Sequence, residues 1–352
     1  IINGQLKTTS DHDLFQFEGK QGQQLTIDAL ARRIDSKSEL MVTLQAPDGR
    51  TLQQSQNQVQ GDPLINLTLP QNGNYLIKVR DSLHRGGAEY VYRLVLSTRP
   101  QIDFVFPPAG LLGSNDKYTV YGRNLPGGKA SRFTIDGTPL QQFETNIPIP
   151  KQVADQLDFD ARLDPHQAGL DGFTFRIDSP AGKSNAFLMT VAGVKRVLEQ
   201  AENDSPQQAQ SIDFPCEIHG QFYSKRDIDW FTFEATAGQK LAIDLLSHRL
   251  GQPTDPSLLI QRVTLTDDGE EKLQQIVWHD ELTTRIRDKG FDHRHNDQTY
   301  LFTAPTDGTY RLMVRDSYSS VQSDPRLFYR LCIRQPQPDF RLAASPIDHP
   351  GS

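Results

Sequence analysis

Long hydrophobic runs and basic runs are both missing from this chain of 352 residues. No apolar stretch approaches the ~20 residues that a helix needs to cross a bilayer, so we expect no membrane span. The net charge is −7 at pH 7, and no cluster of lysine and arginine offsets it. This balance disfavours a nucleic-acid partner, because binding to phosphates needs a basic face.

Motifs of the common catalytic sites are also missing. The sequence contains no Gly-x-Ser-x-Gly, no His-Glu-x-x-His and no P-loop. Carboxylates are plentiful, so a hydrolase that uses a pair of them stays a distant alternative. The expectation is that the chain is not an enzyme.

Cysteine is scarce. Cys216 and Cys332 are the only two, and neither lies in a Cys-x-x-Cys motif. They fall near the first and the last predicted strand of one segment. Two interpretations stay open: a disulfide that joins neighbouring strands, or two buried thiols in apolar strands.

What the chain does contain is a repeat. The segment DHDLFQF at 11–17 returns as DIDWFTF at 227–233, and GQQLTID at 22–28 returns as GQKLAID at 238–244. Further on, Pro-x-x-Gly-x-Tyr and Val-Arg-Asp-Ser recur in the same order, with a longer middle loop in the second copy. A duplicated unit without a duplicated catalytic constellation favours a module that binds or spaces.

Strand signals dominate the whole chain and predict an all-β fold. Alternating or β-branched apolar runs are separated by Asp-Gly and Asn-Gly turns about every 8–12 residues, which is typical of β-sandwiches. The spacing predicts three sandwich domains in series, at 1–100, 101–193 and 194–338. Residues 339–352 are expected to begin a further linker or domain, so the chain is interpreted as part of a longer protein.

The repeated unit resembles the bacterial pre-peptidase C-terminal domain, a jelly-roll β-sandwich appended to secreted proteins. The matching motifs are ENDSP at 202–206, DIDWFTF at 227–233, AGQKL at 237–241 and APTDGTY at 304–310. The first copy matches from Gly4 onward without the Glu-Asn-Asp segment. The middle segment is similar to IPT/TIG-type immunoglobulin-like domains through its YGRNLPGG turn at 121–128.

The resemblance implies an exported accessory module with a calcium site. Related domains of clostridial collagenases bind calcium and collagen. Transferred position by position, the family's calcium ligands are Glu202, Asn203, Asp204, Asp227 and Asp229. The weaker counterpart in the first copy is Asp11 and Asp13.

Physical chemistry gives the calcium hypothesis independent support and also an alternative. Calcium takes six to eight oxygen ligands, and Asp-x-Asp at a strand start places both carboxylates on one face. The alternative is that these aspartates only make turn and backbone hydrogen bonds. Lys225 and Arg226 favour that alternative, because nearby cations weaken a cation site.

A second polar cluster lies in the longer middle loop of the second copy. Its members are Asp292, His293, His295, Asn296 and Asp297. Two histidines two residues apart can share a face in an extended segment, but no third metal ligand follows at a motif spacing. The cluster is interpreted as a solvated loop or a recognition loop.

Together these features predict a non-catalytic binding, adhesion or accessory module array of a large exported bacterial protein, with calcium as its candidate stabilising ion. Its expected partners are an extracellular protein or polysaccharide and the neighbouring domains of its own chain. The alternative is a structural spacer that positions a catalytic neighbour. The expected location is extracellular, cell-surface or periplasmic.

Overall fold

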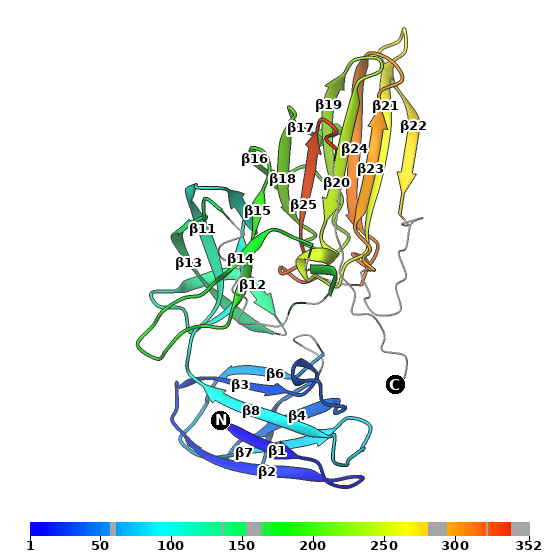
Figure 1. The fold of residues 1–352 in the computed structure, drawn as a ribbon. Helices are drawn as coiled ribbons and strands as arrows, with labels where there is room; N and C mark the ends of the chain where they lie inside the picture. Colours follow the sequence, from blue (N-terminus) through cyan, green and yellow to red (C-terminus); the bar gives the residue numbers. More distant parts are fainter. Residues whose placement is uncertain are drawn as a thin grey trace. The chain divides into compact units, whose positions relative to one another are not determined.

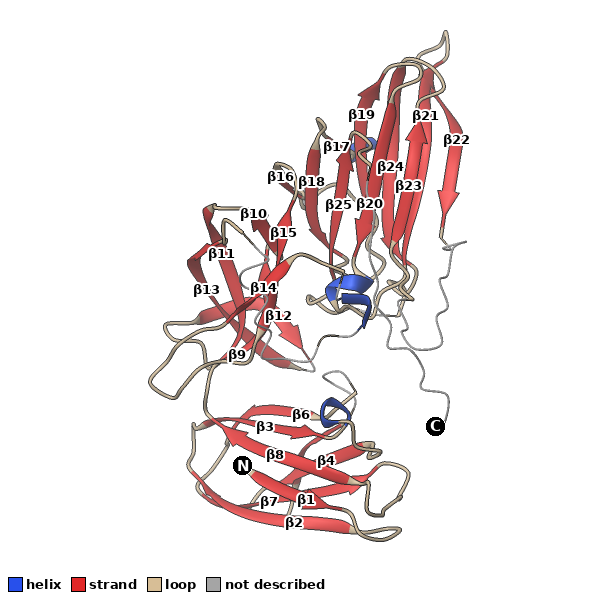
Figure 2. Ribbon diagram, in the orientation of Figure 1, coloured by secondary structure: helices blue, strands red, loops and turns tan. Residues whose placement is uncertain are grey.

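The computed structural model describes most of the chain, namely residues 1–56, 61–135, 137–152, 163, 165–167, 169–280, 294–321 and 323–338. Strands make up nearly all of its regular structure, and the helical turns are single 3₁₀ turns (Figure 2). The predicted all-β fold is therefore confirmed. In the described part no helix is long and apolar enough to cross a membrane.

The N-terminal sandwich consists of two four-stranded antiparallel sheets (Figure 1). One sheet has the order β1 (Ile2–Gln5), β8 (Val91–Ser97), β3 (Gln24–Leu30), β6 (Leu64–Thr68). The other has the order β2 (His12–Gly19), β7 (Gly73–Asp81), β4 (Leu40–Gln45), β5 (Thr51–Ser55). A 3₁₀ turn, η1 (Arg32–Ile34), follows β3.

The C-terminal sandwich repeats this plan with two five-stranded sheets. The first sheet has the order β16 (Arg196–Leu198), β18 (Cys216–Gln221), β25 (Phe328–Arg334), β20 (Lys240–Leu246), β23 (Gln298–Thr303). The second has the order β17 (Gln210–Ser211), β19 (Asp229–Ala235), β24 (Gly308–Asp316), β21 (Pro256–Leu265), β22 (Glu271–His279). Its 3₁₀ turns are η4 (Pro206–Gln208) and η5 (His248–Leu250).

The middle segment forms two further sheets. One has the order β12 (Lys129–Ile135), β13 (Thr138–Pro148), β11 (Asn115–Arg123), β9 (Gln101–Phe106). The other has the order β10 (Ala109–Leu111), β15 (Phe187–Ala192), β14 (Gly172–Phe175), and η3 (Pro165–Gln167) precedes β14.

No described sheet mixes strands from two of the three predicted segments. The compact units of the chain are nevertheless divided differently, because their boundary runs through the middle segment. One unit comprises 1–103, 121–143 and 176–185, and the other comprises 104–120, 144–175 and 186–352. The domain limits at 100 and 193 therefore stay a prediction.

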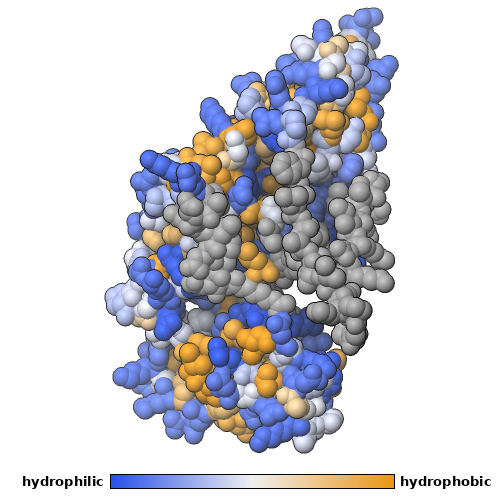
Figure 3. All heavy atoms as spheres, viewed as in Figure 1, coloured by the Kyte–Doolittle hydropathy of each residue, from blue (hydrophilic) through white to orange (hydrophobic). Residues whose placement is uncertain are grey.

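The cores follow from strict alternation along the strands. In β4, every second side chain from Leu40 onward is buried, and the residues between them are partly exposed. Each sandwich has its own cluster of buried apolar side chains between its two sheets. The visible surface is mostly hydrophilic, with apolar side chains in scattered groups (Figure 3).

A buried tyrosine pins the same turn in both sandwiches. The Tyr75 hydroxyl donates to the Gln71 carbonyl at 2.6 Å, and the Tyr310 hydroxyl donates to the Thr306 carbonyl at 2.7 Å. Both tyrosine side chains are fully buried. The two copies therefore share this tyrosine-to-carbonyl hydrogen bond as well as their sequence motifs.

The disulfide interpretation is wrong, because both cysteines are free thiols. In the pairing of β18 with β25, Cys216 lies opposite Ile333 and Glu217 lies opposite Cys332. Neighbouring positions on a strand point to opposite faces, so the two thiols lie on different faces of one sheet. Burial raises the pKa of Cys216 to about 11 and that of Cys332 to about 12.

A buried aspartate organises the 3₁₀ turn in each sandwich. Asp297 accepts hydrogen bonds from the backbone of Ser247 at 2.7 Å and of His248 at 2.6 Å, and from Arg249 Nε at 2.8 Å. In the N-terminal sandwich, Asp62 plays the same part for Arg32 and Arg33. Both aspartates are fully buried.

We predict that Asp297→Ala destabilises the C-terminal sandwich by ~3–5 kcal/mol, because Arg249 is left as a buried charge without a partner. Urea unfolding followed by tryptophan fluorescence measures this directly, since both tryptophans of the chain lie in that sandwich. The control is the exposed Asp267, whose substitution by alanine is expected to change stability by less than ~0.5 kcal/mol. Equal effects of the two substitutions would contradict the assigned role.

Candidate metal centre

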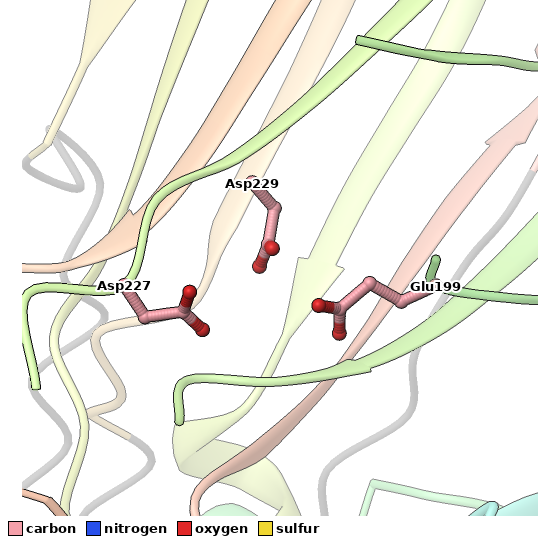
Figure 4. Close-up of side chains that lie close together, drawn as sticks. All are labelled: Glu199, Asp227 and Asp229. Carbon is pink, nitrogen blue, oxygen red and sulfur yellow. The ribbon is translucent and has the colours of Figure 1, made fainter. Parts of the chain in front are cut away.

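Three carboxylates meet at one end of the C-terminal sandwich. Glu199 directly follows β16, Asp229 is the first residue of β19, and Asp227 lies two positions before it. One oxygen from each of the three lies within 4.8 Å of the others. Figure 4 shows their side chains converging on one small volume.

Backbone contacts hold two of these carboxylates in place. The backbone N–H of Gln221, at the end of β18, donates to Glu199 Oε2 at 2.8 Å. The backbone N–H of Tyr223 donates to Asp227 Oδ2 at 2.9 Å. Glu199 also shares a side-chain hydrogen bond with Asp229, and Asp227 accepts a second backbone hydrogen bond from Ile228.

Gly220 makes room for the Glu199 carboxylate. A Cβ at position 220 would lie 2.3 Å from Glu199 Oε2 and 2.4 Å from the ring of Tyr329. The same close approach exists in the N-terminal sandwich, where a Cβ on Gly4 would meet the Tyr92 ring at 2.2 Å. Only glycine leaves enough space at these positions.

The Asn203 side chain faces Asp229. The Asn203 amide is fully buried and, with its nitrogen turned inward, donates to Asp229 Oδ1 at 3.2 Å and to the Gln200 carbonyl at 2.8 Å. Rotation of the amide by half a turn would point its oxygen toward the same two acceptors. That second orientation is stabilised either when Asp229 is protonated and donates to the amide oxygen or when a cation lies between the oxygens.

Burial and mutual repulsion keep these acids from ionising at their usual pH. Burial, with the charges of Asp227 and Asp204 nearby, raises the pKa of Glu199 to about 7. Burial and the charge of Asp204 raise the pKa of Asp227 to about 6. Burial together with Glu199 and Asp227 raises the pKa of Asp229 well above its usual range. The site therefore holds protons at neutral pH unless a cation replaces them.

The sequence prediction named most, but not all, of these residues. Asp227, Asp229 and Asn203 are brought together as expected, and Asp204 lies close enough to act on Asp227 through its charge. Glu202 is exposed and is not in the three-carboxylate group. Glu199 was missed, although an acid at the end of a strand just ahead of Glu-Asn-Asp was the available signal.

The counterpart in the N-terminal sandwich is only half of such a site. Asp11 Oδ2 accepts from the backbone N–H of Lys7 at 2.7 Å, as Asp227 does from Tyr223. Asp13 accepts from the Tyr92 hydroxyl. Within the described ranges, only the group around Glu199 joins three potential metal ligands. In the first copy the aspartates thus have the hydrogen-bonding role weighed above.

The polar cluster of the longer loop lies partly outside the described residues, which exclude Asp292 and His293. Asp297 is fully buried under η5, so it serves the fold and not a recognition surface. Asn296 is half-buried and donates through its side chain to the Thr254 carbonyl at 3.2 Å. His295 is half-buried.

Comparison with known proteins identifies a family for part of the chain. Residues 11–81 match the model of the bacterial pre-peptidase C-terminal domain. No curated protein sequence matches the chain. The second copy of that domain and the IPT/TIG-like middle domain stay predictions.

Several solved structures show a distant similarity. The pre-peptidase C-terminal domain of Bacillus anthracis collagenase is 16% identical, with a TM-score of 0.26, and covers 38% of this chain and 100% of its own. The CBM22-1–CBM22-2 tandem domain of Paenibacillus barcinonensis Xyn10C is 9% identical, with a TM-score of 0.19, over 91% of this chain and 82% of that one. The Vibrio cholerae secreted serine protease VesC is 8% identical, with a TM-score of 0.22, over 94% of this chain and 48% of that one.

The raised pKa values predict how stability depends on pH without metal. An acid with a raised folded-state pKa stabilises the fold fully below its unfolded pKa, and this contribution disappears as pH rises to the folded value. For Glu199 that window runs from 4.5 to about 7, and for Asp227 from 3.8 to about 6. We therefore expect these two acids to lower the free energy of unfolding in EDTA as the pH rises from 4.5 to 7, whereas the buried His219, whose pKa is lowered by burial, acts in the opposite direction up to pH 6.5.

Urea unfolding at a series of pH values in EDTA tests this expectation. Glu199→Gln should flatten the fall, because the variant has one carboxyl fewer to ionise. Glu18→Gln, an exposed residue of β2, is the matched control and should leave the slope unchanged. A profile that Glu199→Gln does not alter would show that the carboxyl is not perturbed.

Proposed function

We propose that this chain is a non-catalytic binding array of an exported bacterial protein, and that its C-terminal sandwich is stabilised by calcium. The observation that carries the proposal is the group of three close carboxylates, in which Asp227 and Asp229 are buried and Glu199 is partly exposed, and in which burial and mutual repulsion raise all three pKa values. Such a group is unstable in its ionised form unless a cation neutralises it.

The donor set favours calcium over a transition metal. Glu199, Asp227 and Asp229 supply carboxylate oxygens, and Asn203 and the Gln200 carbonyl can add two more. These are all hard oxygen donors, whereas zinc and copper sites use histidine or cysteine. Oxygen ligands in this number suit calcium, which accepts six to eight and takes the rest from water.

Calcium would fasten the segment that leads into the sandwich. Glu199, Gln200 and Asn203 lie between β16 and β17, whereas Asp227 and Asp229 lie at the start of β19. A shared ion therefore joins two stretches of backbone that otherwise meet through a few hydrogen bonds. One of these runs from the Trp230 N–H to the Asn203 carbonyl at 2.9 Å.

Burial argues against a catalytic use of the same acids. Raised pKa values are also found in general acids, so the hydrolase alternative needs an answer. Asp229 is fully buried and Asp227 is 8% exposed. Of the three acids only Glu199 is partly exposed, so a substrate would meet a single carboxyl, whereas an ion of atomic size could contact all three.

The match of residues 11–81 to the pre-peptidase C-terminal family supports export and an accessory role. Extracellular modules bind calcium with dissociation constants of ~10⁻⁴–10⁻³ M, which matches the calcium outside cells. The proposed partners are an extracellular polysaccharide or protein, together with neighbouring domains of the chain. A spacer without any ligand is the alternative.

We predict that 10 mM calcium raises the free energy of unfolding of the C-terminal sandwich by ~1–3 kcal/mol relative to EDTA at pH 7.5. Glu199→Gln should have opposite effects in the two conditions. In EDTA it should be more stable than the parent, because one repelling charge is gone. In calcium it should be less stable than the parent, because one ligand is gone.

The matched control is Asp11→Asn, the counterpart of a ligand in the N-terminal sandwich. It should leave the calcium response unchanged. Binding should also release protons at pH 6, since calcium displaces those on Glu199 and Asp229. Calorimetry in two buffers with different ionisation enthalpies counts these protons. No calcium response at millimolar concentration would reject the metal site.

A further inference from the structure

Both tryptophans of the chain lie in one row across a sheet of the C-terminal sandwich. In the strand register, Trp230 of β19 pairs with Met313 of β24. Met313 pairs with Leu259 of β21, and Leu259 pairs with Trp278 of β22. The tryptophan row, Trp230–Met313–Leu259–Trp278, therefore runs straight across four neighbouring strands.

The tryptophan row lies on the outer face of the sheet. Its chain neighbours Phe231, Ile260 and Leu312 belong to the buried core, and Val277 packs against it. Successive residues of a strand point to opposite faces, so the row points away from the core. Both tryptophans are partly exposed, whereas Met313 and Leu259 between them are 4% and 7% exposed.

The N-terminal sandwich shows that the fold does not need this row. The same register places Leu14, Lys78, Thr43 and Gln54 at the four equivalent positions. There the row is mostly polar, and Leu14 is 52% exposed. An apolar row with two buried residues in the middle and a partly exposed tryptophan at each end is thus an addition to the second copy.

Two arginines and two carboxylates lie around the tryptophan row in the described part of this sheet. The Arg315 guanidinium lies over the Trp278 ring, 4.8 Å from its centroid, and Arg315 Nε donates to Ser257 Oγ at 3.3 Å. The indole N–H of Trp278 donates to Asp280 Oδ2 at 2.8 Å. In the next row, Arg311 pairs with Glu271 through two hydrogen bonds of 2.5 Å.

From these observations we propose that the tryptophan row binds a neutral polysaccharide. The inference deepens the binding role proposed above and rests on it. Four strands ~4.8 Å apart place the end residues ~14 Å from each other, a span that covers several sugar units. Indole faces give apolar contact with the C–H faces of sugar rings. The paired arginines and carboxylates beside the row offer donors and acceptors to hydroxyl groups.

The shape and charge of the row favour this occupant over others. A stable protein interface buries ~800 Å² per partner, far more than a strip one residue wide provides. A nucleic acid would need unpaired cations along the strip, but Arg311 is paired and Arg315 is stacked and hydrogen-bonded. A neutral polymer with many hydroxyl groups matches a charge-balanced strip.

The test is binding of the intact chain to insoluble cellulose, chitin and xylan and to soluble mixed-linkage β-glucan, with collagen fibrils as the protein alternative. Trp230→Leu and Trp278→Gln install the residues of the first copy and so preserve the sandwich. Each is expected to weaken polysaccharide binding at least tenfold, and the pair to abolish it. Leu14→Ala, at the equivalent exposed position of the first copy, should leave binding unchanged.

The variants must keep the parent's unfolding midpoint and calcium response, which shows that the sandwich is intact. Polysaccharide binding that survives both tryptophan substitutions would overturn the proposal, as would binding to none of the four glycans. If the parent bound only collagen and the variants did not, the polysaccharide proposal would be wrong, but the general binding role proposed above would be supported. A parent chain that binds a glycan through the two tryptophans but shows no calcium response would support the tryptophan row and reject the metal site alone.

Discussion

The constraint on which this structure depends is that every strand of a sandwich must place alternate side chains in the space between two sheets. A shift by one residue would exchange the two faces, so the apolar pattern fixes the register of each strand pair. In the C-terminal sandwich, Phe231, Ile260 and Leu312 must meet in the core. The same register then aligns their chain neighbours on the outer face of the sheet.

The same constraint places buried carboxylates at the ends of the strands, where the chain turns and backbone N–H groups lack strand partners. Asp62 and Asp297 satisfy such groups around the 3₁₀ turns. Asp81 does so by accepting from the backbone of Glu39 at 2.8 Å and of Leu83 at 3.0 Å. Aspartates with several donors are stable when ionised. Glu199, Asp227 and Asp229 instead lie close to one another, so that burial and mutual repulsion raise the pKa of each, and this makes their site a metal site in our proposal.

Much of the fold followed from the sequence, because alternation and turn residues act over short distances. The all-β class, the repeat and the pair Asp227 and Asp229 all depend on local patterns. Glu199 depends on β16 pairing in parallel with β18, which brings Leu198 beside His219 and the next residue beside Gly220. The faces of Cys216 and Cys332 depend on the register of β18 with β25. Neither pair of strands is consecutive in the chain, so a local sequence pattern does not indicate either pairing.

The proposed binding surface, the tryptophan row, also depends on strand pairings that a local sequence pattern does not indicate. Trp230 belongs to a repeated motif, but Trp278 lies in the longer part of the second copy and has no aligned counterpart in the first. Only the strand register shows that they share a row. Trp230 directly follows Asp229 in the chain and donates its backbone N–H to the Asn203 carbonyl. An ion held by Asp229 and Asn203 would fix the backbone of Trp230 from both sides. Calcium would then order one end of the row, which links the metal and the binding face through a single residue.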